Sequence, residues 1–303
     1  SLHIKIIKNN LLNNNIEAAN KYYIKLKNLG CSDNNIECNS ILQSIGPLIN
    51  GVSYLKKNRN NKAVKAFSDI KNIKDNNLYG ALLKAWSLAN YYTYKKSIEA
   101  LDKINSDNYS NEIIMHKALI YDLVNEIELA EIFYEQALNH NKEINLINYY
   151  LNFLHRNNKI QKKEEFLKKL YSDTSYQISI NNDILLDTRL IENQINGVGL
   201  VLYDASQFLG FDDIDLSISI LNIANYSFPN LFEVDFLSAT LLQSLRQSDK
   251  AILLYKSIPN NHYLSSMAVI QLANLLSLQN KEDDAIKILS LIHISEPTRR
   301  RGI

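Results

Sequence analysis

The sequence is poor in the residues that interrupt helices. Of its 303 residues, 8 are glycine and 4 are proline, about a third of the usual share of these two residue types. So few turn-forming residues argue against a β-sandwich, a collagen-like sequence and a flexible linker protein. Hydrophobic residues make up 46% of the chain, which is enough for a folded core and excludes wholesale disorder.

An excess of charge of one sign and long apolar runs are also lacking. The chain has 33 Lys and Arg against 32 Asp and Glu, a net charge of +1. Because proteins that bind nucleic acids carry a basic footprint, we expect no nucleic-acid partner. No apolar run approaches the length of about 18 residues that spans a bilayer. We therefore expect no membrane span.

Motifs for catalysis and for metal binding are absent as well. The sequence contains no phosphate-binding loop, dinucleotide fingerprint, zinc-protease motif or nucleophile elbow. Cys31 and Cys38 have no further ligands at zinc-site spacing, so we expect two independent thiols; a disulfide is the alternative in an oxidising compartment. Asp212, Asp213 and Asp215 lack the Gly and Glu of a calcium loop and are expected to cap a helix. The sequence thus predicts no enzyme activity, no metal and no cofactor.

Two groups of polar residues are assigned to the outer faces of amphipathic helices. His116 with Asp122 or Glu126 is an acid–base set on paper, but surface positions on a helix explain these residues better. The second group is a lysine run that is interleaved with Glu164 and Glu165 and is typical of a solvated helix face. It consists of Lys162, Lys163, Lys168 and Lys169.

Helical periodicity runs along almost the whole chain. Apolar residues recur at helical spacing, as in Leu82, Ala85, Trp86 and Ala89. Asn-rich turns such as Asn58–Asn61 and Asn157–Asn158 separate the predicted helices, and Asn suits these positions because it tolerates a left-handed backbone. These features predict an all-α fold.

A short pattern repeats along the chain. A small residue is followed after four positions by a large residue and after seven by an apolar one. The pattern begins at Ala63, Ser97, Ala130, Lys163, Ser217, Ala251 and Ala285, with steps of 34, 33, 33, 54, 34 and 34 residues. Twelve residues before each start lie Gly51, Ala85, Ala118, Leu151, Ala205, Ala239 and Ala273. Small residues at both positions let two helices approach closely.

This pattern resembles the tetratricopeptide repeat (TPR), a helix–turn–helix unit of about 34 residues. The resemblance covers residues 40–171 and 193–288, and a divergent earlier copy ends in Ala19, Tyr23 and Leu26. The consensus Trp is lacking, and Leu151 with Lys163 is a poor close-packing pair. Some segments resemble a group of bacterial TPR proteins that has no settled activity: Gly80–Asn90, His116–Ala130, Gly197–Pro229 and Tyr255–Pro259.

The resemblance implies a right-handed superhelix of about seven to eight antiparallel helix pairs. An N-terminal stack would cover residues 1–171 and a C-terminal stack residues 193–288. The long step of 54 residues implies an insert or linker at 172–192.

The end of the sequence differs in character. Leu289 to Arg299 reads LSLIHISEPTR, which resembles the translation of a transposase-based sequencing adapter. The chain also begins at Ser1 rather than Met. We therefore expect residues 289–303 to be a non-native tail and the chain to be a fragment. Its location, in the bacterial periplasm or envelope or in the cytoplasm, stays open, as does its oligomeric state.

The TPR resemblance also implies a function, namely a non-enzymatic scaffold that binds a partner peptide or protein on a concave face lined by first helices. The residues it places there are Leu48, Val52, Leu82, Trp86, Met115, Asp122, Asn148, Asn152, His155, Phe236, Gln243 and Asn274. Trp86 is the expected anchor, with packing between repeats as the alternative. An accessory region of a larger enzyme is the second hypothesis, and base-by-base RNA reading is the least favoured.

Overall fold

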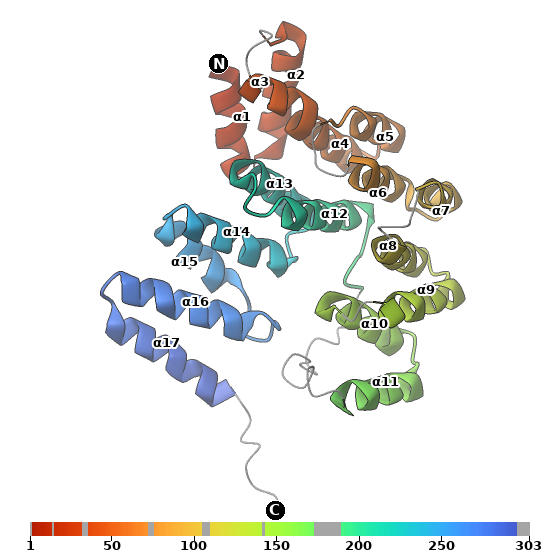
Figure 1. Cartoon of the computed structure of the whole chain (residues 1–303). Coiled ribbons are helices and arrows are strands. Elements are labelled where there is room, and N and C mark those ends of the chain that lie inside the picture. Colours follow the sequence, from red (N-terminus) through yellow and green to blue (C-terminus); the bar gives the residue numbers. More distant parts are fainter. Residues whose placement is uncertain are drawn as a thin grey trace, which may run out of the picture. The chain divides into compact units, whose positions relative to one another are not determined.

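The computed structural model describes residues 2–13, 15–31, 36–71, 76–104, 110–140, 143–172 and 189–295. Within these ranges the chain forms seventeen α-helices, one π-helical turn and no strand (Figure 1). The all-α prediction is therefore confirmed. No helix in the described part of the chain combines the length and the hydropathy needed to cross a membrane.

The chain divides into two compact units, residues 1–178 with 185–230 and residues 179–184 with 231–303. The helices of the first unit are α1 (Leu2–Leu12), α2 (Ile16–Leu29), α3 (Ile36–Ser40), η1 (Ile41–Ile45), α4 (Gly46–Lys56), α5 (Asn60–Ser68), α6 (Asn76–Leu88), α7 (Tyr94–Asp102), α8 (Ser110–Leu123), α9 (Ile127–His140), α10 (Ile144–Arg156), α11 (Ile160–Ser172), α12 (Gln194–Leu209) and α13 (Ile214–Ser227). Those of the second are α14 (Phe232–Ser244), α15 (Ser248–Ser257), α16 (Ser265–Leu278) and α17 (Glu282–Ser295).

Consecutive helices pack as hairpins, and several of the turns share one backbone device. The turn residues Asn58, Asn125, Asn158, Arg246 and Asn280 all have positive φ, between 54° and 64°. They close the hairpins α4–α5, α8–α9, α10–α11, α14–α15 and α16–α17. Asn adopts this left-handed conformation more readily than most residues. The prediction for Asn58 and Asn158 is confirmed, whereas Arg246 shows that the turn does not require Asn.

The repeated small residues lie where the helices of a pair meet. Gly51 on α4 faces Phe67 on α5, and a Cβ at Gly51 would overlap the Phe67 ring. Ser97 on α7 is fully buried and its Oγ donates to the carbonyl oxygen of Ala85 on α6, at 2.7 Å. The second helix of one pair then packs on the first helix of the next, as α5 does on α6 and α9 on α10. This arrangement is compatible with an α-solenoid.

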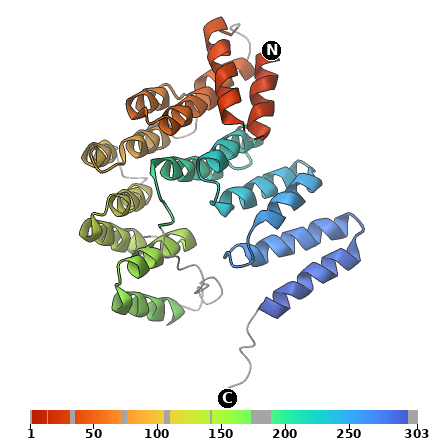
Figure 2. The same ribbon diagram turned by 180° about the vertical axis from the view of Figure 1, so that it is seen from behind.

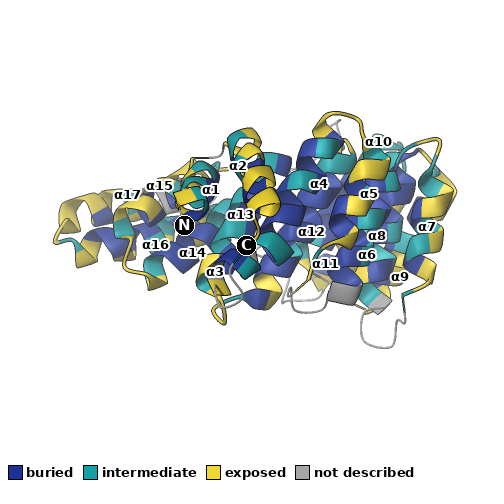
Figure 3. Ribbon diagram, turned by 90° about the horizontal axis from the view of Figure 1, so that it is seen from above, coloured by how far each residue is buried: buried dark blue, intermediate teal, exposed yellow. Residues whose placement is uncertain are grey.

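Helix α12 packs on first helices from early in the chain rather than on α11. Apart from its hairpin partner α13, it contacts α6 most extensively and α4 to a lesser degree, while α13 contacts α1 and α4. Figures 1 and 2 show this hairpin beside α4 and α6 from both sides, and Figure 3 shows α12 as mostly buried. At the centre of this contact a Cβ added to Gly197 would overlap the indole ring of Trp86.

The compact units therefore differ from the two expected stacks. Helices α12 and α13, expected to open the C-terminal stack, belong to the first unit by their contacts. The boundaries at 171 and 192 concern repeats rather than compactness and stay a prediction. Most of the insert, residues 173–188, lies outside the described residues, as do residues 296–303 of the expected tail.

The cysteines correct one expectation. Cys31 and Cys38 form a disulfide with Cα atoms 5.9 Å apart, so they are not independent thiols. Cys38 lies in α3, which begins at Ile36. This Cα separation is within the distance that a disulfide spans. Spacing in the sequence does not reveal this approach.

We predict that Gly197→Ala destabilises the first unit. The methyl group would overlap Trp86, and overpacking costs about 1–3 kcal/mol, more than the ~1 kcal/mol that Ala gains over Gly in a helix. Trp86 is the only tryptophan, so its fluorescence during urea unfolding reports this unit directly. Gly80→Ala in α6 is the matched control, because a Cβ there meets no atom within 4 Å; it should be neutral or stabilising. Equal effects of the two substitutions would contradict the packing described.

Candidate functional site

The first unit contains a cavity of about 380 Å³, within the size range of ligand-binding pockets. Helices α6, α8, α9, α10 and α12 and the residue preceding α10 contribute to its walls. The apolar part is formed by Tyr79, Met115, Ala137, Leu146 and Phe208. The polar part is formed by Asn111, Glu112, Glu143, Asp204 and Gln207.

Helical spacing brings the wall residues to one side of each helix. Glu112 and Met115 are three residues apart on α8, and Asp204 and Phe208 are four apart on α12, so each pair shares a face. Tyr79 on α6 connects to α12: its hydroxyl donates to the backbone carbonyl oxygen of Asp204 at 3.4 Å, and its ring centroid lies 6.3 Å from that of Phe208. The docking of α12 on α6 thus builds one wall of the cavity.

A series of polar side-chain contacts leads from the buried residues Trp86 and His116 to Asp204. The indole Nε1 of Trp86 donates to Nδ1 of His116 at 3.0 Å, and Nε2 of His116 lies 3.6 Å from Oδ2 of Asp204. Because an indole N–H only donates, Nδ1 of His116 must accept, which places the imidazole proton on Nε2. His116 is therefore a neutral imidazole whose N–H faces the carboxylate. It is fully buried, so the assignment of His116 to a helix surface was wrong.

The residues expected on the concave face of the first stack differ in their burial and in their positions. Leu48, Val52, Leu82 and Trp86, on the helices that α12 covers, are fully buried. Trp86 therefore has a packing role, because its buried indole is not exposed to a partner. Met115 lines the cavity. The remaining residues lie further along α8 and α10: Asp122, Asn148 and Asn152 are buried and His155 is half-buried.

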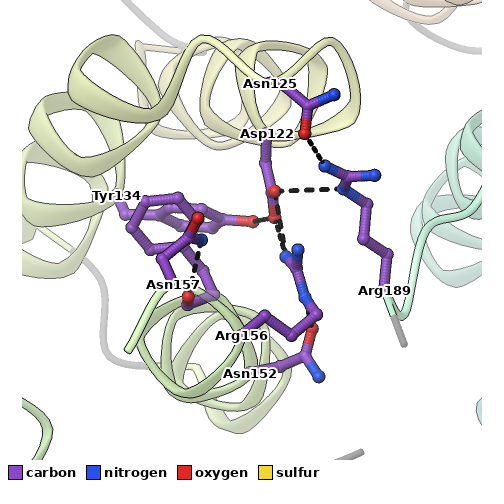
Figure 4. A network of polar contacts seen from close by, with 8 residues as sticks. Asp122, Asn125, Tyr134, Asn152, Arg156, Asn157 and Arg189 are labelled. Atoms are coloured by element: carbon purple, nitrogen blue, oxygen red, sulfur yellow. Dashed lines mark hydrogen bonds and ion pairs between the residues drawn. The ribbon is translucent and has the colours of Figure 1, made fainter. Parts of the chain in front are cut away.

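Asp122 is the centre of an ion-pair network (Figure 4). Nη2 of Arg156 donates to both carboxylate oxygens, at 2.9 and 2.6 Å, and the hydroxyl of Tyr134 donates to Oδ2 at 3.2 Å. Burial and the neighbouring carboxylate raise the pKa of Tyr134 well above its usual value, which keeps the hydroxyl protonated as a donor. Nε of Arg156 also donates to Oδ1 of Asn152 at 2.9 Å. The Asp122 carboxylate is thus engaged in contacts within the protein, and Asp122 is not a surface residue.

The same network holds the chain that leads into α12. Arg189 precedes α12 in sequence, and its Nε lies 3.4 Å from Oδ1 of Asp122. Its Nη2 donates to Oδ1 of Asn125 in the α8–α9 turn. These contacts attach the start of the returning segment to the end of α8 (Figure 4). We assign the network a structural role.

A second ion-pair cluster involves one residue of the lysine run. Lys162 contacts the carboxylates of Glu131 and Glu135, and Nζ of Lys159 lies 2.6 Å from Oε2 of Glu131. Desolvation of Glu131 favours its neutral form, but hydrogen bonds from the two lysines outweigh it and lower its pKa. Lys162 therefore joins α11 to α9 while it stays exposed, and Lys168 and Lys169 are exposed as well, as a solvated face requires.

In the second unit, the expected binding residues are partly engaged with one another. The Phe236 ring lies 5.5 Å from that of Tyr255, whose hydroxyl donates to Oε1 of Gln243 at 3.2 Å. Burial raises the pKa of Tyr255. Asn274 is exposed. Elsewhere in the chain, Asp213 caps α13 by accepting from the backbone N–H of Leu216 at 3.0 Å, which confirms the capping prediction for this residue.

Sequence reasoning missed the cavity residues on α12. Phe208, three residues after the close-packing Ala205, has an exposed side chain at the cavity. Asp204 and Gln207 carry no motif. An aromatic residue flanked by polar residues one turn away was the available signal, but its meaning depends on where α12 docks.

In the second unit, the pKa of His262 is shifted from its usual value. The Tyr263 hydroxyl donates to Oε1 of the buried Glu233 at 2.9 Å, and Nε2 of His262 lies 3.8 Å from the same oxygen. Burial lowers the pKa of His262 to about 4. The carboxylate opposes this shift, but the backbone N–H of Leu264 donates to Nδ1 at 3.3 Å and requires the neutral ring.

The described residues contain no group of three or more His, Cys, Asp and Glu side chains placed to hold a metal ion. A scan of the chain against protein-family models finds no matching family, and no curated protein matches it. The geometry of the cavity is therefore the basis of the functional argument.

We predict that Arg156→Met destabilises the first unit by about 3 kcal/mol, because it leaves the buried Asp122 carboxylate without its main partner. Arg189→Met is the matched comparison. Its side chain is more exposed and more distant from Asp122, so we expect a loss of about 1 kcal/mol or less. Urea unfolding followed by Trp86 fluorescence measures both. A loss for Arg189→Met as large as that for Arg156→Met would overturn this ranking.

We predict that the second unit loses stability as the pH falls from about 6.5 to about 4. In this window the unfolded chain protonates its imidazole while folded His262, with a pKa of about 4, does not, so protonation favours unfolding by roughly 3 kcal/mol at the low end. His262→Phe should remove this dependence. An NMR titration of the histidine Cε1–H resonances in the full chain measures the pKa directly; a value near 6.5 would refute the prediction.

Proposed function

We propose that this chain is a TPR-type α-solenoid and acts as a non-enzymatic scaffold that binds a partner peptide through the cavity in its first unit. The observation that carries the proposal is the cavity itself. It has a mixed apolar and polar wall and lies on the first helices α6, α8 and α10, where a TPR array is expected to bind.

The positions of the hairpins support the TPR assignment. Seven predicted pairs correspond to α4–α5, α6–α7, α8–α9, α10–α11, α12–α13, α14–α15 and α16–α17. The small residues at the two repeated positions are buried throughout, including Ala118 with Ala130 and Ala239 with Ala251. Lys163, in the pair that departs from the pattern, is only half-buried. The hairpin α1–α2, with buried Ala19, Tyr23 and Leu26, supports one additional, divergent pair.

The position of α12 narrows the binding surface. First helices α4 and α6 are covered by α12, which buries Val52 and Trp86. The part of this surface that keeps a cavity is next to α8 and α10. A peptide residue inserted there would contact Met115 and Phe208 and would find hydrogen-bonding groups on α8 and α12. Apolar burial with a few polar contacts is the usual basis of peptide recognition.

We predict that peptides selected from a random display library on the full chain lose binding when Met115 is replaced by Lys. A charged side chain would fill the cavity and remove its apolar contact, for an expected loss of at least about tenfold in affinity. The chain has two methionines, and the second, Met267, is exposed in the other unit. Met267→Lys is therefore the matched control and should leave binding unchanged.

Binding is measured by fluorescence anisotropy, with thermal melts to verify that each variant is folded. Selected peptides that bind both variants as tightly as the parent chain would place the site elsewhere. Failure to select any peptide would contradict the proposed function.

A further inference from the structure

The polar groups of the cavity wall favour one kind of ligand. Glu112 and Asp204 place carboxylates on its wall and Glu143 adds a third, while the lining residues that the structure describes include no lysine, arginine or histidine. Ionised carboxylates only accept hydrogen bonds. The occupant that suits these groups therefore supplies N–H donors and positive charge.

The charge of Asp204 is not cancelled from behind. Among the described residues, the basic group within ion-pair distance of Asp204 is His116, whose Nδ1 accepts from the indole N–H of Trp86 and which is therefore a neutral imidazole. Nε2 of His116 is buried, lies 3.6 Å from the carboxylate and makes no hydrogen bond within the described residues. The Asp204 carboxylate is therefore not hydrogen-bonded by His116 and can accept from a ligand.

An unpartnered acceptor points in the same direction. Oδ1 of Asn111 is buried at the cavity wall and accepts no hydrogen bond from the described part of the protein. A buried acceptor without a donor costs about 1–3 kcal/mol. A ligand that brings an N–H group removes this cost on binding, whereas an anionic or purely apolar ligand does not.

The apolar wall defines the remainder of the occupant. Tyr79, Met115 and Phe208 present two rings and a flexible thioether. The aliphatic stem of a lysine or arginine packs on such a surface while its head group reaches the carboxylates, and aromatic rings attract a cation placed over their faces. A volume of about 380 Å³ accommodates one such side chain with its flanking backbone.

We infer that the cavity between α8 and α12 is a recognition pocket for the cationic side chain of a lysine or arginine in the partner peptide. This inference rests on the proposed function and specifies the chemistry of its ligand. Glu112 and Asp204 are the charge partners, Asn111 accepts an N–H, and Tyr79, Met115 and Phe208 hold the stem.

The two methionines permit a direct test. In the full chain labelled with ¹³C at the methionine methyl groups, Met115 reports the cavity and Met267 is an internal control outside it; Met267→Leu assigns the two signals. The probes are the Nα-acetyl N-methylamides of lysine and arginine, with those of norleucine and citrulline as uncharged counterparts. We expect the cationic probes to shift the Met115 signal in a saturable way, at least about fivefold more tightly than the uncharged ones, and to leave Met267 unmoved.

Charge variants test the assignment of the partners. Glu112→Gln should weaken the lysine and arginine probes about threefold to fivefold, and raising the salt concentration should weaken them further. Asp204→Asn should weaken them about tenfold, because this carboxylate is better shielded from water. Glu165→Gln, at an exposed position of α11, removes the same charge outside the cavity and should have no effect.

Equal binding of the norleucine and lysine probes, or an unmoved Met115 signal, would overturn the inference. These results are separate from the display experiment. Selected peptides that depend on Met115 but not on a basic residue would sustain the peptide-binding function and refute the cation pocket. Cationic probes that bind when no peptide can be selected would do the reverse.

Discussion

The first unit depends on one contact, the seating of α12 against Trp86. Gly197 has no side chain, and this lets the helix backbone lie directly on the indole ring. The same indole orients His116, and His116 in turn faces Asp204, four residues before Phe208 on α12. A steric requirement at one glycine thus determines where the acidic and aromatic wall of the cavity stands. The cavity exists because α12 lies over α6 and leaves the surface next to α8 and α10 uncovered.

The electrostatic contacts are consistent with this arrangement. Arg189 connects the chain before α12 to Asp122, and Arg156 satisfies the same carboxylate from α10. Buried ion pairs add little net stability, but they penalise alternatives in which one partner is lost. The network therefore serves mainly to fix the path by which the chain returns to α6. Hydrophobic burial of α12 supplies most of the free energy, and the network makes its position specific.

Local features were predictable from the sequence, and the docking of distant elements was not. Periodicity and small residues located the helix pairs, because the residues that pack between neighbouring helices are close in sequence, as Gly51 and Phe67 are. Asn58 and Asn158 marked left-handed turns for the same local reason. The burial of His116 and the cavity around Met115 depend instead on α12, which begins 78 residues after His116. A repeat pattern describes nearest neighbours and carries no information about a later pair that folds back.

The distance along the chain between Trp86 and Gly197 also affects how this protein is made. During synthesis at about 5–20 residues per second, the ribosome needs on the order of ten seconds to pass from α6 to α12. Throughout that time the hairpins up to α11 form from local contacts, but the apolar face of α6 has no cover. A nascent chain of this kind exposes its tryptophan and its neighbouring leucines to chaperones and to other chains. Completion of the first unit therefore requires the closure of a loop of 111 residues between Trp86 and Gly197, a less local step than the pairing of adjacent helices.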